Sequence, residues 1–229
     1  MPSSPKAALE PRKRPVQARS AVTVDALLQA TVQVLLDVGK ERLTTTRVAY
    51  RAGVSVGTLY QYFPNKSALL QAAMKRHLDT VMDTVEEVCR QQRGNTLSQM
   101  ATALVHAFLE AKMKDVKTST ALYFASSDLD GVKIARRNSV RVNQAIVAML
   151  ETAREGFAAD PQIAAFMVQG AMTGVSRRLL EAEAPEKHLE ALRQELVLLI
   201  CTYLEACAGD SRSNLRLIHN SWTSQARTF

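Results

Sequence analysis

Apolar residues recur at spacings of three and four between Val22 and Val38, which is the pattern of an amphipathic helix. The predicted stripe comprises Val24, Leu27, Leu28, Thr31, Val34, Leu35 and Val38. We expect Asp25 to stabilise the first turn of this helix through the helix dipole. Gly39 is expected to end it, because glycine readily adopts the left-handed conformation that follows many helices. The pattern therefore predicts a first helix over residues 22–38.

Two short helices are predicted next. Thr44 is a natural N-cap for a second helix over residues 45–52, and Ser55 can cap a third helix over residues 56–63. Gly53 lies between them and can supply a turn with positive φ. The sequence thus predicts a helix, a tight turn and a second helix.

The third predicted helix has one apolar face and one unusual polar face. Leu59 and Phe63 are one turn apart and are expected to anchor the helix. The other face presents Val56, Thr58, Tyr60, Gln61 and Tyr62. It has no Lys or Glu, whereas its hydroxyl, amide and aromatic groups can bond to base edges and phosphates. The two tyrosines could instead pack within the fold. The face nevertheless favours a DNA-reading helix.

The rest of the chain continues the helical pattern. Asn65 can cap a fourth helix that runs to about residue 92, a length of ~40 Å. Thr96 begins a fifth apolar-periodic stretch. Further helices are predicted at roughly 116–127, 130–156, 160–183 and 186–208. Because no strand-like alternation or Asn-Gly hairpin is present, we predict an all-α fold of about nine helices.

Charge is distributed unevenly along the chain, whose formal net charge is +7. Residues 1–66 hold ten Lys and Arg against four Asp and Glu, whereas residues 67–208 hold sixteen against seventeen. A basic N-terminal third indicates a polyanionic partner for that part, with nucleic acid the leading candidate. A basic surface that serves only solubility is the alternative.

The sequence lacks the signals of an enzyme or a metal site. It has no nucleophile motif, Walker loop or dinucleotide fingerprint, and its four histidines are isolated. Cys89, Cys201 and Cys207 have no partners at metal-ligand spacing, and we expect them to be small buried apolar residues. A redox-sensing role for them is the alternative. No catalytic residue, metal or cofactor is therefore predicted.

Nothing in the apolar pattern predicts a membrane helix. The longest apolar run, Leu196 to Leu204, is about half the ~20 residues that a bilayer requires. The first residues carry charge and prolines where a secretory signal needs an apolar core. We therefore expect a cytoplasmic protein.

The segment TTTRVAYRAGVSVGTLYQYFPNKSALL resembles the helix-turn-helix of the TetR family of transcriptional regulators. The resemblance covers roughly residues 22–75 and implies a three-helix, homeodomain-like DNA-binding domain followed by a larger helical domain. The DNA contacts that it implies are Thr45, Thr46, Ser55, Val56, Gly57, Thr58, Tyr60, Tyr62 and Lys66. Tyr50 departs from the family, which more often carries an acidic or small polar residue there. This departure affects packing or adds a DNA backbone contact.

The resemblance also implies how the chain divides. We expect a flexible basic arm over residues 1–20, a DNA-binding domain over 21–81, a ligand-binding and dimerisation domain over 82–208, and a polar tail over 209–229. The arm could follow DNA or be a passive tail, and the tail could dock on the body or be disordered.

Two sites are expected in the second domain. Small residues four apart, followed by a strongly apolar helix, favour a helix-pair dimer surface, with close packing inside one subunit as the alternative. The predicted interface comprises Gly170, Gly174, Leu192, Leu196 and Leu199. The ligand pocket implied by the family is assigned to Met100, Leu104, Phe108, Tyr123, Phe124, Asn143, Phe166 and Met167. Met and aromatic side chains suit an adaptable apolar cavity, although each could be plain core.

The function implied is a homodimeric repressor, released from a palindromic operator in double-stranded DNA by an apolar or amphipathic small-molecule effector. A ligand-independent regulator or an activator of the same fold is an alternative. A helical protein-interaction module is another.

Overall fold

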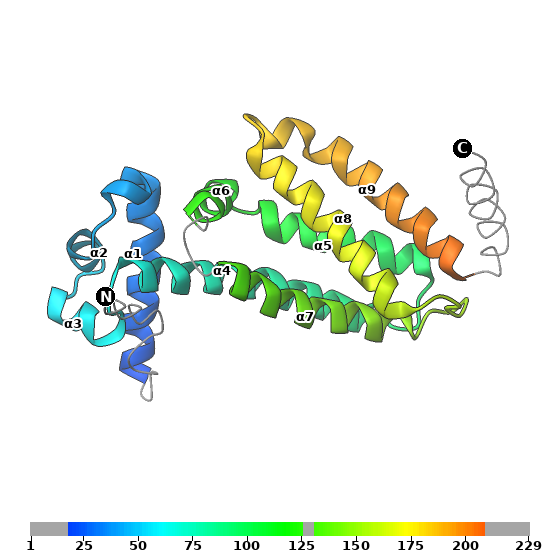
Figure 1. The fold of residues 1–229 in the computed structure, drawn as a ribbon, viewed down its shortest axis with the longest axis horizontal. Helices are drawn as coiled ribbons and strands as arrows, with labels where there is room; N and C mark the ends of the chain where they lie inside the picture. The colour runs from blue at the N-terminus through cyan, green and yellow to red at the C-terminus, as the bar shows by residue number, and fades with distance from the viewer. Residues whose placement is uncertain (1–17, 126–130, 209–229) are drawn as a thin grey trace, which may run out of the picture. The chain divides into compact units, whose positions relative to one another are not determined.

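The computed structural model describes residues 18–125 and 131–208. Within these stretches the secondary structure is entirely helical, which confirms the all-α prediction (Figure 1). The described helices are α1 (Ala18–Arg42), α2 (Thr45–Arg51), α3 (Val56–Tyr62), α4 (Lys66–Gln91), α5 (Leu97–Met113), α6 (Val116–Ala125), α7 (Gly131–Leu150), α8 (Pro161–Glu181) and α9 (Pro185–Ala208). The predicted tail at 209–229 and most of the predicted arm at 1–20 lie outside the described residues.

By their contacts, the helices form two compact units. The first unit takes the chain up to Thr80 and also Asp115–Arg137, and the second takes Val81–Lys114 and the chain from Asn138 onward. Helix α6 therefore groups with the N-terminal helices, although α5 precedes it in the sequence. The predicted division after residue 81 stays a prediction.

The core of the first unit joins α1, α2, α3, the first part of α4 and α6. Leu27 of α1, Val48 of α2 and Leu59 of α3 are completely buried, and Leu122 of α6 belongs to the same cluster. Each such side chain contributes about 1.5–3 kcal/mol when it is fully buried. Phe63, directly after α3, is also buried, as predicted from its spacing with Leu59. The position of α3 is thus fixed from beneath by apolar packing.

Helix α1 is longer than predicted. Its backbone is interrupted at Gly39, where φ is 74° and ψ is 170°, as expected from that glycine. Because α1 begins at Ala18, Asp25 does not lie in the first turn and the predicted dipole role is wrong. Instead, Arg76 of α4 donates to the carboxylate and the carbonyl oxygen of Asp25, both at 3.3 Å.

By length and composition alone, Ser20–Arg42 of α1 could cross a membrane. Its buried apolar residues, Leu27, Leu28, Ala30, Val34 and Leu35, belong to the core of the first unit. That packing accounts for the apolar composition of the helix. The absence of a membrane helix stays a prediction.

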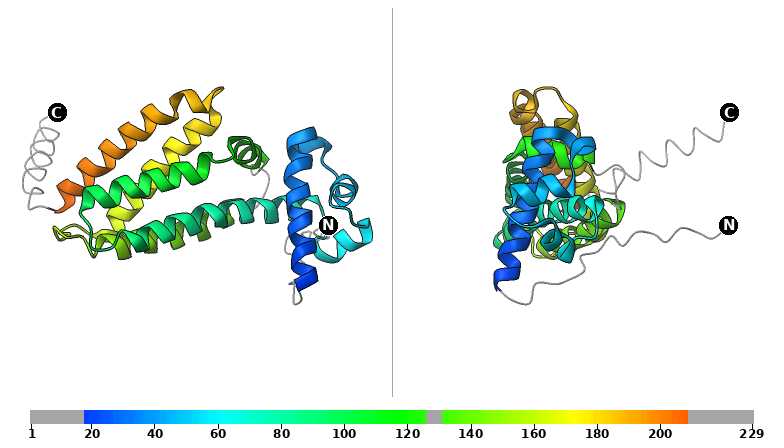
Figure 2. Two further views of the ribbon diagram at one scale, coloured as in Figure 1. Left: turned by 180° about the vertical axis from the view of Figure 1, so that it is seen from behind. Right: turned by 90° about the vertical axis from the view of Figure 1, so that its left-hand side faces the viewer.

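The second unit is built mainly from α5, α7, α8 and α9. Helix α5 packs against α8 and α9, which also pack against each other (Figure 2). A capping box between Thr96 and Gln99 starts α5, and Asp160 caps α8. Helix α7 ends at Leu150 rather than at residue 156, because the backbone N–H groups of Thr152 and Ala153 bond three residues back in turns, to Met149 and Leu150.

Candidate nucleic-acid interface

Hydroxyl side chains begin the two short helices of the first unit, as predicted. Thr44 Oγ1 accepts a hydrogen bond from the backbone N–H of Arg47 at 3.3 Å, and Ser55 Oγ accepts one from Thr58 at 3.0 Å. Between the helices, Gly53 has a φ of 68°, a conformation that side-chain-bearing residues rarely adopt. These local bonds produce the predicted helix-turn-helix.

Hydrogen bonds between side chains order the exposed surface of α3. The hydroxyls of Thr45 on α2 and Tyr60 on α3 lie 3.0 Å apart, and those of Ser55 and Thr58 lie 2.8 Å apart. Each hydroxyl can make further hydrogen bonds, because it has one donor and two lone pairs. The polar groups are therefore held in place before any ligand arrives, which lowers the entropic penalty of binding.

The predicted DNA contacts divide into exposed and half-buried residues. Thr46, Ser55, Gly57 and Tyr60 are exposed. Thr45, Val56, Thr58, Tyr62 and Lys66 are half-buried. Val56 and Tyr62 pack against the first-unit core, so only part of each side chain can reach a partner. The contacts themselves stay predictions.

Gly57 leaves bare backbone on the exposed side of α3. A Cβ atom at this position would lie 3.7 Å from Ser55 Oγ, which is an ordinary van der Waals contact. The fold therefore has room for a side chain at residue 57. A glycine that packing does not require, on an exposed helix, suits the close approach of a ligand to the backbone.

Lys66 has a structural role that the sequence did not show. Its Nζ donates to the carbonyl oxygen of Lys40 at 3.0 Å, near the end of α1. This bond satisfies a carbonyl group that lies beyond the regular part of the helix. An ammonium group has three N–H donors, so this bond is compatible with a phosphate contact.

Helix α2 carries surface residues that the predicted contact set omits. Tyr50 is 89% exposed, which excludes the packing role considered for it. Arg47 is also exposed, and Arg51 pairs with Asp37 of α1 at 2.5 Å. Gln61 of α3 is exposed as well. In the sequence, this surface could have been inferred from Thr46 and Tyr50, which lie one helical turn apart on α2.

The predicted dimer residues lie on α8 and α9 of the second unit. Gly170 and Gly174 are exposed, and a Cβ atom at either would meet no atom within 4 Å. Close packing inside the subunit therefore does not explain these glycines. Leu199 is 57% exposed and Leu192 is half-buried. Leu196 is only 2% exposed, so its assignment to a surface is corrected to the subunit core.

The residues predicted to line the ligand pocket are distributed over both units. Met100, Leu104 and Phe108 are buried on α5, and Asn143 is half-buried on α7. Tyr123 and Phe124 belong to α6 of the first unit and form an edge-to-face pair with ring centroids 5.3 Å apart.

Phe166 and Met167 of α8 are 68% and 53% exposed, so they lie on the surface of the second unit. Their exposure favours the surface of α8 and α9 over an enclosed pocket for these two residues. The pocket as a whole stays a prediction.

Two family models match the chain. The model for bacterial regulatory proteins of the tetR family matches residues 27–73, and the model for the tetracyclin repressor-like C-terminal domain matches residues 96–204. The first match includes α2 and α3, and the second includes α5 to α8 and most of α9.

Individual relatives are more distant. Nucleoid occlusion factor SlmA of Haemophilus ducreyi is 32% identical over 96 residues, which are 40% of this chain and 46% of SlmA. The chain thus aligns with about half the length of that relative. The transcriptional activator FasR of Mycolicibacterium smegmatis is 29% identical over 129 residues, covering 56% of this chain and 52% of FasR.

The fold is shared with solved structures. One of them is the triclosan complex of SmeT, the repressor of a multidrug efflux pump in Stenotrophomonas maltophilia. It superposes on this chain with a TM-score of 0.63 at 24% sequence identity. That alignment covers 82% of this chain and 92% of SmeT. Taken with the two family models, the helix-turn-helix and the helical second unit show that the chain belongs to the TetR family of DNA-binding transcriptional regulators, which are not enzymes.

Proposed function

We propose that the protein is a homodimeric repressor that leaves a palindromic operator when a small molecule binds its second unit. The main support for a dimer is a set of exposed apolar residues on two neighbouring helices, which we call the α8–α9 face. It comprises Ile163, Phe166, Met167, Gly170, Gly174, Leu198 and Leu199. Several exposed large apolar side chains on two helices that pack together favour an interface.

A second copy fits this face better than an unrelated partner. Interfaces between identical subunits bury the same patch on both, and the two glycines let a facing helix approach closely. A dimer also presents two copies of α3. On a palindromic operator their binding sites would be about one helical turn, ~35 Å, apart.

Reading of DNA is assigned to exposed and half-buried residues on α2, on α3 and directly beside α3. Ser55, Thr58 and Tyr60 offer hydroxyls to bases or phosphates, and Gly57 leaves the backbone open between them. Thr45, Thr46, Val56, Tyr62 and Lys66 complete the proposed contact surface. A regulator of this kind acts on the chromosome, which supports the proposed cytoplasmic location.

The effector is proposed to be apolar or amphipathic. Buried Met100, Leu104 and Phe108 give α5 an apolar face in the second unit. The fold relative SmeT has been solved with triclosan, a precedent for a small-molecule ligand on this fold. An effector that releases DNA must bind free protein more tightly than DNA-bound protein, and DNA must weaken effector binding by the same factor.

An activator of the same fold is the second candidate. The relative FasR is named a transcriptional activator, although its alignment covers only 52% of that protein. The position of the operator decides between the two. A site that overlaps a promoter supports repression, whereas a site upstream of it supports activation.

The α8–α9 face is tested by measuring the mass of the protein in solution. We expect a dimer for the natural chain and a monomer for the double variant Phe166→Glu/Leu199→Glu, because four charges would be buried in the dimer. Val140→Glu is the matched control, since Val140 is 52% exposed on α7 and should leave the dimer intact. A dimer in the double variant would refute this face.

Release is tested by screening amphipathic compounds in two parallel assays. One measures binding to the protein by a rise in melting temperature, and the other measures the affinity for a genome-selected operator. Compounds that bind should weaken the operator complex. If every compound that stabilises the protein leaves operator affinity unchanged, ligand release is wrong.

A further inference from the structure

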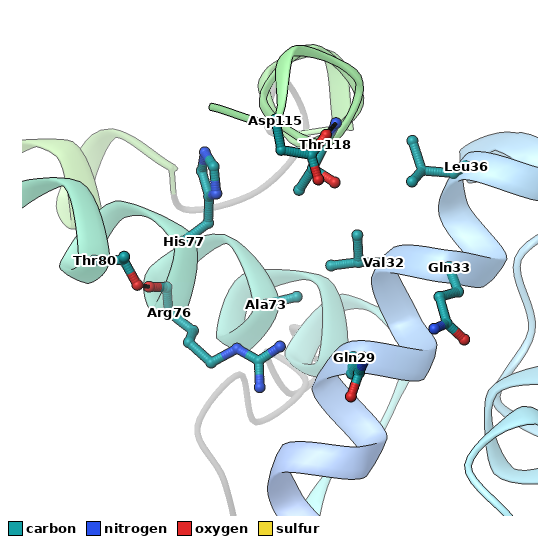
Figure 3. Close-up of a pocket in the computed structure, with 10 residues that line it drawn as sticks. All are labelled: Gln29, Val32, Gln33, Leu36, Ala73, Arg76, His77, Thr80, Asp115 and Thr118. Atoms are coloured by element: carbon teal, nitrogen blue, oxygen red, sulfur yellow. Dashed lines mark hydrogen bonds between the residues drawn. The ribbon is translucent and has the colours of Figure 1, made fainter. Parts of the chain in front are cut away.

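A hollow of about 400 Å³ lies in the first unit between α1, α4 and the start of α6 (Figure 3). Its volume is within the range of ~300–1,000 Å³ that is usual for small-molecule sites. All its lining residues belong to the first unit, and none of them is among the residues predicted to line the effector pocket, although Tyr123 and Phe124 of that set also belong to the first unit. Neither the helix-turn-helix contacts nor the α8–α9 face uses it.

One wall of the hollow is aliphatic. Val32 and Leu36 project into it from α1, and Ala73 lies across from them on α4 (Figure 3). Leu36 is 43% exposed, whereas its neighbours on the inner side of α1 are buried in the core. An aliphatic group of a ligand would remove this leucine from water at about 25 cal/mol per Å² of covered surface.

A cation lines the same hollow. Arg76 extends from α4 towards α1 in Figure 3, and its Nη1 reaches the carboxylate of Asp25 at 3.3 Å. The side chain of Asp25 is 72% exposed, and such exposed ion pairs contribute only about 0–1 kcal/mol. Because a guanidinium has five N–H donors in a planar fork, Arg76 can also bind a ligand carboxylate.

An anion lies at the start of α6. Asp115 Oδ1 accepts the backbone N–H of Thr118 at 2.9 Å. Hydrogen bonds from the side chain and backbone of Thr118 lower the pKa of Asp115, so the carboxylate is charged at neutral pH. His77 Nε2 lies 3.0 Å from Ser119 Oγ, which joins α4 to α6 and keeps Asp115 beside the hollow.

We propose that this hollow binds a small aliphatic zwitterion, with its carboxylate on Arg76, its ammonium group on Asp115 and its carbon chain against Val32 and Leu36. Asp115 would repel a ligand with a single negative charge, and Arg76 would repel a ligand with a single positive charge. A zwitterion satisfies both. The exposed carboxamides of Gln29 and Gln33 on α1 can donate to or accept from either end.

The test uses two zwitterions that differ in charge spacing, L-leucine and 6-aminohexanoate, titrated into the full chain by calorimetry. Their single-charge analogues are 4-methylpentanoate and 3-methylbutylamine for the first, and hexanoate and hexylamine for the second. We expect at least one zwitterion to bind at least tenfold more tightly than both its analogues. Nuclear Overhauser contacts from its carbon chain should reach the methyl groups of Val32 and Leu36.

Two variants assign the charges. Arg76→Gln and Asp115→Asn should each weaken zwitterion binding at least tenfold, and asparagine keeps the ability of residue 115 to accept the Thr118 N–H. Lys75→Gln is the matched control, because Lys75 pairs with Asp79 and does not line the hollow. Melting curves of the variants verify that they are folded.

The proposal is overturned if neither zwitterion binds at about 20 mM, a concentration that would reveal even millimolar affinity. It is also overturned if a single-charge analogue binds as tightly as its zwitterion, or if the control variant loses as much affinity as the other two. These outcomes do not depend on DNA binding or dimerisation, so they leave the proposed function untouched.

Discussion

Substitution of Gly57 by alanine separates the stability of α3 from its contact with DNA. The added Cβ would meet only Ser55 Oγ at 3.7 Å, and Gly57 is not among the glycines with positive φ. Alanine is favoured over glycine inside a helix by about 0.5–1 kcal/mol. For a chain of this length, 1 kcal/mol corresponds to about 2–4 °C in melting temperature, so we expect a rise of about 1–4 °C.

The affinity for DNA should change in the opposite direction. If the backbone of α3 approaches the operator at Gly57, the new methyl group occupies space in a packed interface, and overpacking typically costs about 1–3 kcal/mol. We expect operator affinity to fall about 5- to 150-fold. Fluorescence anisotropy with a labelled, genome-selected operator measures this loss at one fixed salt concentration, since phosphate contacts make affinity strongly salt-dependent.

Gly53→Ala is the matched control, because Gly53 has a φ of 68° and alanine is strained there. That strain should lower the melting temperature, whereas the affinity of the folded protein should change little well below the transition. Unchanged operator affinity in Gly57→Ala would refute the proposed close approach. A lower melting temperature in Gly57→Ala would contradict the stability argument.

Two further substitutions and one labelling reaction test the roles given to Lys66, Arg141 and Cys89. Lys66→Ala should lower the free energy of unfolding by about 1 kcal/mol, because the bond to Lys40 is lost. It should also reduce the slope of log Kd for the operator against log salt by about 0.9 per subunit. An unchanged slope would exclude a phosphate contact. Burial, helped by the charge of Glu86, raises the pKa of the Cys89 thiol from 9.0 to about 12. At pH 8, iodoacetamide should therefore label Cys89 about a thousandfold more slowly in native protein than in urea. Similar labelling rates would contradict this burial. Arg141→Met removes hydrogen-bonded ion pairs with Glu86 at 2.8 Å and Asp83 at 3.1 Å. It should lower the free energy of unfolding by up to about 1 kcal/mol in low salt. A loss equally large in 1 M salt would rule out an electrostatic origin.

Features set by neighbouring residues could be predicted from the sequence. The N-caps at Thr44 and Ser55 depend on residues three positions away, and the anchors Leu59 and Phe63 are one helical turn apart. Local hydrogen bonds and periodicity determine such features, so the helix-turn-helix was predicted closely. The error at Asp25 arose because the helix begins earlier than its apolar stripe.

Features set by distant residues could not be predicted in this way. The part of α9 from Leu196 to Leu204 is apolar on nearly all sides, so periodicity could not tell buried Leu196 from exposed Leu199. The bond from Lys66 to Lys40 spans 26 positions. Likewise, Leu122 is apolar in the sequence, but only the fold shows that it joins the first-unit core.

The proposed function rests on the claim that α3 reads the sequence of DNA. Thr58→Ala tests this claim: Ser55 Oγ accepts the N-cap hydrogen bond from the backbone N–H of residue 58, which survives the substitution, whereas the bond between the Ser55 and Thr58 hydroxyls is lost. The measurement is the binding motif selected from genomic fragments by the natural protein and by the variant. We expect a palindromic motif whose preference relaxes at one position in each half-site. An identical motif for both proteins would contradict the claim.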